Sequence, residues 1–77
     1  MTLKIISATE VLFEGEVEMV TLPGENGRFT VLNNHASLIS TLVTGDITYR
    51  HGAETSTTRI EGGIADVDNN LVSVCVY

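Results

Sequence analysis

The sequence is divided into short segments rich in β-branched residues, and residues that favour turns separate these segments. Apolar and polar residues alternate in most segments, as they do in a strand with one buried and one solvated face. Nine such segments follow one another: Leu3–Ser7, Glu10–Glu14, Glu16–Leu22, Arg28–Leu32, Leu38–Val43, Asp46–Arg50, Glu54–Ile60, Ile64–Asp68 and Leu71–Tyr77. No long stretch has the capping residues of a helix. This spacing predicts an all-β fold, a flattened β-sandwich or barrel of about nine to ten short strands.

Turn-forming residues connect these segments at well-marked places. Pro23–Gly27 is the strongest cluster, because proline fixes φ and glycine accepts positive φ. Gly52 follows His51 at a hairpin position, and the adjacent Asn69 and Asn70 tolerate the left-handed backbone of a tight turn. The chain is therefore expected to reverse direction at these three points.

Alternation within two segments predicts how their side chains are distributed. In Leu71–Tyr77, the residues Val72, Val74 and Val76 share one face, and a serine and a cysteine lie on the other. Glu16–Leu22 is predicted to be one continuous strand, with Val17, Met19 and Thr21 on one face and Glu16, Glu18 and Val20 on the other.

Length and charge limit what the chain can do. Its 77 residues predict a single domain, residues 1–77. Four basic residues stand against ten acidic ones, a formal net charge of −6. This balance argues against nucleic-acid binding and against anionic membrane surfaces, because both repel acidic proteins. It fits a soluble protein and a basic protein partner equally well.

The sequence shows no segment suited to membrane insertion or export. No apolar run approaches the ~20 residues of a membrane helix. The first residues lack the apolar stretch of a signal peptide. Cys75 is the only cysteine, which fits a reducing compartment. A cytosol-facing domain without direct membrane insertion is expected.

The two histidines do not suggest a catalytic or metal centre. His51 lies next to a glycine in a predicted hairpin, where a solvated side chain is expected. His35 follows two asparagines in a loop, where it either caps the next segment or contacts a partner. They lack ligand-like spacing, and no cysteine–histidine cluster supports them. We therefore predict no metal site and no cofactor.

Other candidate groups also have structural explanations. The glutamates between Glu10 and Glu18 are expected on a solvated strand face, because a working acid–base pair needs two different environments. Cys75 has no basic neighbour to stabilise a thiolate, so a half-buried packing role is expected. Gly24–Gly27 lacks the lysine and the following helix of a phosphate-binding loop. The chain is interpreted as a non-catalytic binding or structural module.

Four longer strings occur in a fixed order and at a distinctive spacing. They are Leu12–Val17 followed by Leu22–Leu32, Asn34–Leu42 leading to Gly45–Ile47, Glu61–Val67, and Asn70–Val74. In this order they resemble, over essentially the whole chain, the N-terminal β-sandwich domain of the epsilon subunit of F-type ATP synthases.

The chain departs from that family in three ways. Asn33 and Asn34 replace a frequent Pro-Gly pair, and Ser37 replaces a proline. The C-terminal helical hairpin that usually follows is absent from these 77 residues. The initial Met1 favours a naturally short chain.

The resemblance implies a mechanical role rather than a reaction. Epsilon subunits belong to the central stalk, where they join the gamma subunit to the membrane c-ring during proton-driven ATP synthesis. The expected location is the cytoplasmic face of the bacterial inner membrane, reached through the complex. Nucleotide binding in the family belongs to the helical hairpin, so no nucleotide is expected here.

The resemblance also implies where the c-ring would bind. The segment that matches the ring-facing part of the family comprises Glu25, Asn26, Gly27 and Arg28. The guanidinium of Arg28 suits the polar loops of the ring because it forms forked hydrogen bonds. Glu25 is a candidate partner for an arginine of those loops.

A second segment matches the part of the family near gamma. It begins at His35 and contains Leu38, Ile39 and Leu42. These three side chains either form an exposed apolar strip, suited to the dry centre of an interface, or belong to the core.

Two other functions remain open at this point. A generic β-sandwich adaptor with an unrelated protein partner would share all these features. An enzyme or small-ligand carrier would need a convergent pocket, for example one lined by His35, Glu25 and Arg28.

Overall fold

The computed structural model describes all 77 residues and consists entirely of strands and their connections. Its nine strands are β1 (Thr2–Ile6), β2 (Val11–Glu16), β3 (Met19–Gly24), β4 (Gly27–Leu32), β5 (Leu38–Leu42), β6 (Gly45–His51), β7 (Glu54–Ile60), β8 (Gly63–Asp68) and β9 (Leu71–Val76). The predicted all-β fold is confirmed. No helix long and apolar enough to cross a membrane is found.

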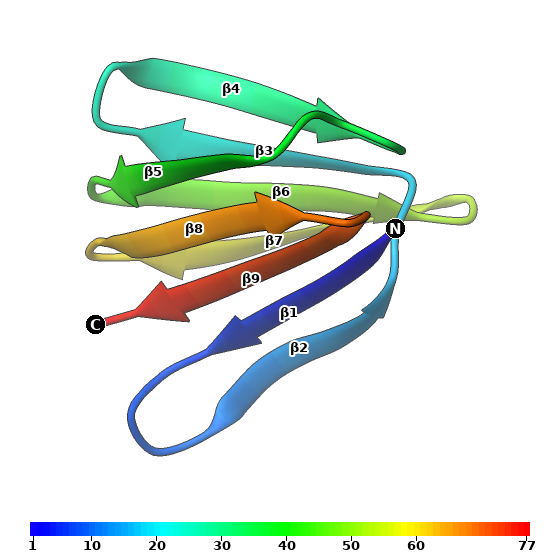
Figure 1. Ribbon diagram of the computed structural model, residues 1–77. Helices are drawn as coiled ribbons and strands as arrows, with labels where there is room; N and C mark the ends of the chain where they lie inside the picture. Colours follow the sequence, from blue (N-terminus) through cyan, green and yellow to red (C-terminus); the bar gives the residue numbers. More distant parts are fainter.

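The nine strands form one hydrogen-bonded sheet that curls into two layers. The order is β2-β1-β9-β8-β5-β3-β6-β7, and β4 pairs with β3. In Figure 1 the strands β5, β8, β9, β1 and β2 form the front layer, and β3, β6 and β7 lie behind them. We call the front layer the five-stranded sheet. The layer behind it, together with β4, is called the four-stranded sheet. All pairs are antiparallel except β1 with β9.

Strand β3 joins the two layers because it changes its neighbour along its length. Thr21 pairs with β6, whereas Gly24 pairs with Leu42 of β5. Pro23 lies between these two points, and its carbonyl accepts a 2.9 Å hydrogen bond from the Val43 N–H. A strand residue directs its N–H and C=O to the same side. The N–H that proline lacks would therefore point to the β5 side, at the point where β3 changes its neighbour from β6 to β5.

The core lies between the layers and follows the alternation of the strands. Val72, Val74 and Val76, which were predicted to share one face, are all buried, and Ala65 and Val67 of β8 lie beside them. Because successive strand residues point to opposite faces, each strand that contributes to the core also presents a row to solvent. Cys75 lies in such a row and is exposed, so its predicted half-buried role is wrong.

The predicted strand Glu16–Leu22 is interrupted by a corner. β2 ends at Glu16, β3 begins at Met19, and the residues between them bond to distant segments. The Val17 N–H donates to the Met1 carbonyl at 2.8 Å, and the Glu18 N–H donates to the Arg50 carbonyl at 2.9 Å. The corner shifts the alternation, so Val20 and Leu22 of β3 are buried together with Val17, although a continuous strand would place them on the face opposite to Val17.

The predicted turns are present, and one is shorter than expected. Asn69 and Asn70 have φ of 50° and 61°, and Gly52 has φ of 65°, as two-residue hairpin turns require. The Pro23–Gly27 cluster is mostly strand, because Gly24 pairs with Gly27 and leaves only two residues in the turn.

The connections gather at two opposite ends of the domain (Figure 1). One end holds the β1–β2, β3–β4, β5–β6 and β7–β8 connections and the C-terminus. The other end holds the N-terminus, the β2–β3 corner, the β4–β5 loop and the β6–β7 and β8–β9 turns.

Candidate partner-binding surfaces

Glu25–Arg28 and His35, which are expected to contact partners, lie at opposite ends of the domain. Glu25 and Asn26 form the β3–β4 turn, followed by Gly27 and Arg28 on β4. His35 lies in the β4–β5 loop at the other end (Figure 1). The one pocket found is lined by His35 but by neither Glu25 nor Arg28.

Arg28 lies on the surface of the four-stranded sheet rather than at the tip of the turn. It pairs with Pro23 across the hairpin, and its Nη1 donates a 2.9 Å hydrogen bond to the Asp46 carbonyl on β6. The Asp46 carboxylate lies 3.5 Å from Nη1 of Arg59 on β7. Glu25 forms no ion pair with Arg28 and stays exposed at the turn. The turn therefore presents the unpaired Glu25 carboxylate, whereas the oriented Arg28 guanidinium lies over β6.

The three apolar residues near His35 have different environments. Leu42 is 3% exposed and belongs to the core, and Leu38 is half-buried against that core. Ile39 is 74% exposed, because its neighbours in the alternation fill the interior. The core interpretation therefore holds for Leu42, and only Ile39 is available at the surface.

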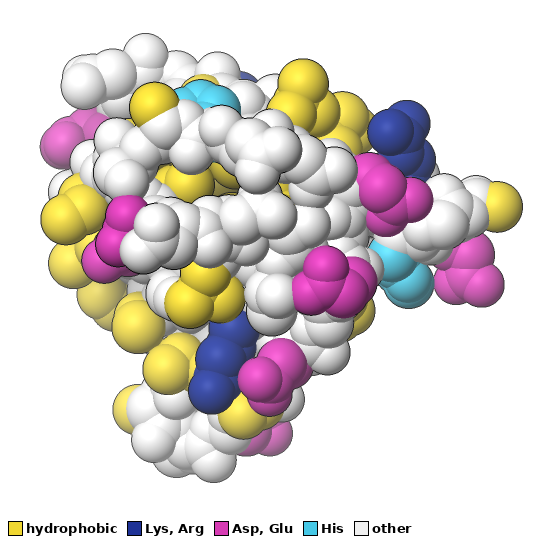
Figure 2. All heavy atoms as spheres, turned by 45° about the vertical axis from the view of Figure 1, so that its right-hand side comes forward, with side chains coloured by type: hydrophobic (Ala, Val, Ile, Leu, Met, Phe, Trp, Pro, Cys, Tyr) yellow, Lys and Arg dark blue, Asp and Glu magenta, His cyan; other side chains and the backbone are white.

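An apolar row that sequence reasoning missed crosses the outer face of the five-stranded sheet. Ile64 pairs with Cys75, Cys75 with Ile6, and Ile6 with Val11, so four strands place these side chains side by side. In Figure 2 hydrophobic side chains gather on the left-hand side, where this sheet lies. The four residues lie on four different strands, and only the register between those strands brings them together.

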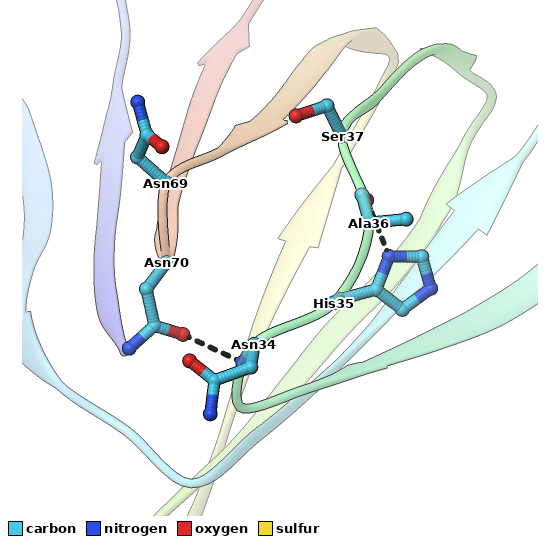
Figure 3. A pocket seen from close by; sticks show the side chains of 6 residues that line it. All are labelled: Asn34, His35, Ala36, Ser37, Asn69 and Asn70. Atoms are coloured by element: carbon cyan, nitrogen blue, oxygen red, sulfur yellow. Dashed lines mark hydrogen bonds between the residues drawn. The ribbon is translucent and has the colours of Figure 1, made fainter.

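A shallow, open hollow lies where the β4–β5 loop meets the β8–β9 turn. It is lined by Asn34, His35, Ala36, Ser37, Asn69 and Asn70 (Figure 3). The Asn34 N–H donates a 2.8 Å hydrogen bond to the Asn70 side chain, and His35 Nδ1 lies 2.7 Å from the Ala36 carbonyl oxygen. The first contact ties the two loops together, and the second lies within the β4–β5 loop. The side chains that line the hollow are polar, apart from that of Ala36.

His51 differs from its prediction as a solvated turn residue. It ends β6 half-buried, and its ring centroid lies 5.8 Å from those of both Phe13 and Tyr49. Its Nε2 lies 3.0 Å from the Ser56 hydroxyl. The histidine therefore packs with aromatic residues where β2 approaches the four-stranded sheet.

Two acidic residues near the N-terminus accept hydrogen bonds from neighbouring segments. No group of three or more potential metal ligands occurs. The Glu18 carboxylate accepts the Gly52 N–H at 2.9 Å, and Glu16 accepts the Thr2 hydroxyl across the β1–β2 pair.

Hydrogen bonding to Thr2 sets the titration of Glu16. The Thr2 hydroxyl and, to a lesser degree, the Met1 ammonium hold the pKa of the Glu16 carboxyl below its ordinary value of 4.5. The folded pKa lies below the unfolded one, so this carboxylate stabilises the fold above the ordinary pKa. That contribution is lost as the pH falls through the folded pKa.

Thr2→Val is therefore expected to raise the pKa of Glu16 toward its ordinary value, since the first cause of the shift is removed. NMR titration of the side-chain carboxyl measures this directly. Thr57→Val on the opposite sheet serves as the control. An unchanged pKa of Glu16 in Thr2→Val would contradict the assignment.

Fold and surface together define a class: a small all-β sandwich domain with polar turns and apolar side chains exposed on one sheet. The family model described as "ATP synthase, Delta/Epsilon chain, beta-sandwich domain" matches residues 1–77. The chain belongs to this family. This membership argues against a generic adaptor of unrelated origin.

Named relatives agree with this assignment. The ATP synthase epsilon chain of Leptospira borgpetersenii is 36% identical over 74 residues, which cover 96% of this chain and 58% of the relative. The epsilon chain of Caulobacter vibrioides is 46% identical over 63 residues, covering 82% and 73%. The chain thus spans little more than half the length of the Leptospira protein.

Solved structures show the same fold. A chain in the Euglena gracilis mitochondrial ATP synthase, solved with OSCP, F1 and c-ring, superposes with a TM-score of 0.89 at 23% identity. The match covers 96% of this chain and 48% of that one. A chain in the central stalk and c-ring of the Tetrahymena thermophila enzyme gives 0.80 at 16% identity, covering 97% and 61%.

Proposed function

We propose that this chain is a non-catalytic central-stalk subunit of an F-type ATP synthase, which links the gamma subunit to the c-ring during proton-driven ATP synthesis. The observation that carries the proposal is the family match over residues 1–77, together with relatives named epsilon chain. A compact β-sandwich with polar turns and an exposed apolar row suits attachment to neighbours better than chemistry.

The location of the subunit and its single-domain organisation belong to the same proposal. The subunit would be peripheral to the membrane, at the cytoplasmic face of the bacterial inner membrane, and held there by the complex. Residues 1–77 would act as one domain, since a single core runs between the two layers. No nucleotide site forms part of the proposal.

The apolar row is proposed as the dry centre of the gamma contact. Ile64 is 50% exposed and Thr41 pairs with it, which places Ile39 on the same face two residues along β5. Apolar side chains grouped on one exposed face favour a protein interface, because burying them removes apolar surface from water.

Pull-down of this chain by purified gamma subunit tests the proposal. The Ile39→Glu, Ile64→Glu double variant should lower the affinity by about tenfold or more, because it buries carboxylates in an apolar contact. Ala53→Glu, at an exposed hairpin tip, is the matched control and should bind normally. Failure of the unaltered chain to bind gamma would remove the proposed function. Normal binding by the double variant would remove only the assigned surface.

The β3–β4 turn is proposed as the c-ring contact. Arg28→Glu should reduce attachment to isolated c-ring by about fivefold, the effect of losing a charge-assisted hydrogen bond and adding a repulsive charge. Lys4→Glu makes the same change on the other sheet and should leave attachment intact. Co-sedimentation with the detergent-solubilised ring provides the measurement. Equal loss in both variants would point to net charge instead of the turn.

A further inference from the structure

Three of the chain's four basic side chains lie on one face, the outer surface of the four-stranded sheet. Pairing places Arg28 opposite Pro23, Arg50 opposite Met19, and Arg59 opposite Asp46. The arginines are all exposed, because the alternate residues of these strands point inward. Asp46 is the only acidic residue among the outward-facing strand positions. Three arginines and one aspartate leave this face with a net charge of +2 in a chain of net charge −6.

A row of four threonines crosses the same face between the arginines. Thr30 pairs with Thr21, Thr21 with Thr48, and Thr48 with Thr57. The Thr21 and Thr30 hydroxyls lie 2.9 Å apart, and those of Thr48 and Thr57 lie 3.5 Å apart. Strands spaced about 4.8 Å apart make this a regular row of hydroxyls about 14 Å long. We call the arginines and threonines together the arginine–threonine face.

The opposite surface has the opposite charge. On the outer face of the five-stranded sheet, the pairing brings together Lys4 with Glu14, Thr2 with Glu16, and Ser73 with Asp66. Asp68 follows on the same face of β8. One lysine among four carboxylates gives this surface a net charge of −3. The domain is therefore polarised across its thickness, which orients it in the field of a charged neighbour.

Strand propensity alone does not explain this arrangement. Threonine favours exposed strand positions, which accounts for single threonines here. It does not account for the gathering of three out of four basic residues on the same four strands. Arg50 forms no ion pair, so its guanidinium is free for a partner, whereas Arg28 and Arg59 are oriented by contacts with Asp46.

We propose that the arginine–threonine face binds a carboxylate-rich surface of a neighbouring protein. Guanidinium groups bind carboxylates through paired hydrogen bonds, and the threonine hydroxyls add donors between them. A nucleic acid is disfavoured, because no aromatic side chain on this face can stack with bases. The face is smaller than a complete interface, so it steers and orients a neighbour held by further contacts.

This inference goes beyond the proposed function, because it does not depend on the identity of the neighbouring subunit. It can therefore be tested with a peptide in place of that subunit. The probe is a 12-residue poly-glutamate peptide, titrated at low salt into ¹⁵N-labelled chain while amide shifts are followed by NMR. Shifts should be confined to β3, β4, β6 and β7. They should weaken as salt is added, because exposed charge pairs are screened.

Matched variants separate the face from overall charge. Arg50→Gln with Arg59→Gln should weaken peptide binding by about fivefold or more, the effect of two exposed charge pairs. Lys4→Gln changes the charge on the other sheet and should bind normally. Arg50→Gln alone removes no ion pair, so it should stay folded and still bind more weakly.

Several results would overturn the inference. These are shifts mainly on β1, β8 and β9, no shifts at millimolar peptide, or equal loss of binding in Lys4→Gln. Tighter binding of short polyphosphate to the same amides would assign the face to phosphate instead of carboxylate. None of these results bears on binding to gamma, so the two proposals can fail separately.

Discussion

Replacing Gly63 with alanine is expected to destabilise the domain by about 3 kcal/mol, the upper range for overpacking a well-packed site. Gly63 begins β8 and pairs with Val76 on β9 and with Leu42 on β5. A Cβ added there would meet the Cys75 carbonyl oxygen and lie 3.0 Å from the Val76 Cα. These are backbone atoms of a central strand, so no side chain can rotate away and β8 must separate from β9.

Urea unfolding followed by circular dichroism measures this effect. A domain of this size has a stability of several kcal/mol, so the midpoint should fall sharply. Gly52→Ala is the control, because its Cβ would meet nothing within 4 Å although its φ is 65°. That variant should lose only about 1 kcal/mol, the cost of a left-handed non-glycine residue. Equal losses in both variants would show that the close approach of β8 and β9 is not the cause.

Ile47→Ala is expected to lower the free energy of unfolding by about 3 kcal/mol. Ile47 lies in β6 with 0% of its surface exposed and packs within the core between the layers. Removing its outer carbons leaves a cavity that a rigid sheet fills poorly, so the loss exceeds the transfer free energy of the missing atoms.

Ile64→Ala makes the same chemical change at the surface. Ile64 is also in a strand, but its side chain is 50% exposed on the outer face of the five-stranded sheet. Thermal and urea unfolding should show a loss below about 1 kcal/mol. If Ile64→Ala proved as costly as Ile47→Ala, the division of these strands into core and surface faces would be wrong.

Local features of the fold could be predicted from the sequence because they depend on neighbouring residues. β7 has the predicted bounds, Glu54–Ile60, and the three valines of β9 are buried as their alternation indicates. The asparagine turn forms where two residues that tolerate positive φ stand together. In each case the conformational preference lies within a few residues.

The errors fall where distant segments meet. The corner at Val17 is stabilised by a bond to Met1, and His51 is half-buried because Phe13 of β2 lies against it. Alternation shows that Ile39 and Leu42 point to opposite faces, but not which face meets the core. That choice depends on the pairing of β5 with β8.

The sequence by itself determined the strands, the turns and the all-β class, because β propensity, alternation and turn chemistry act over short distances along the chain. The tertiary structure alone decided the apolar row and the arginine–threonine face. Both surfaces are assembled by hydrogen-bonded pairing between strands far apart in sequence, such as β3 with β6 and β1 with β9. A strand's own residues fix which side chains alternate, but its neighbours fix which of them lie side by side.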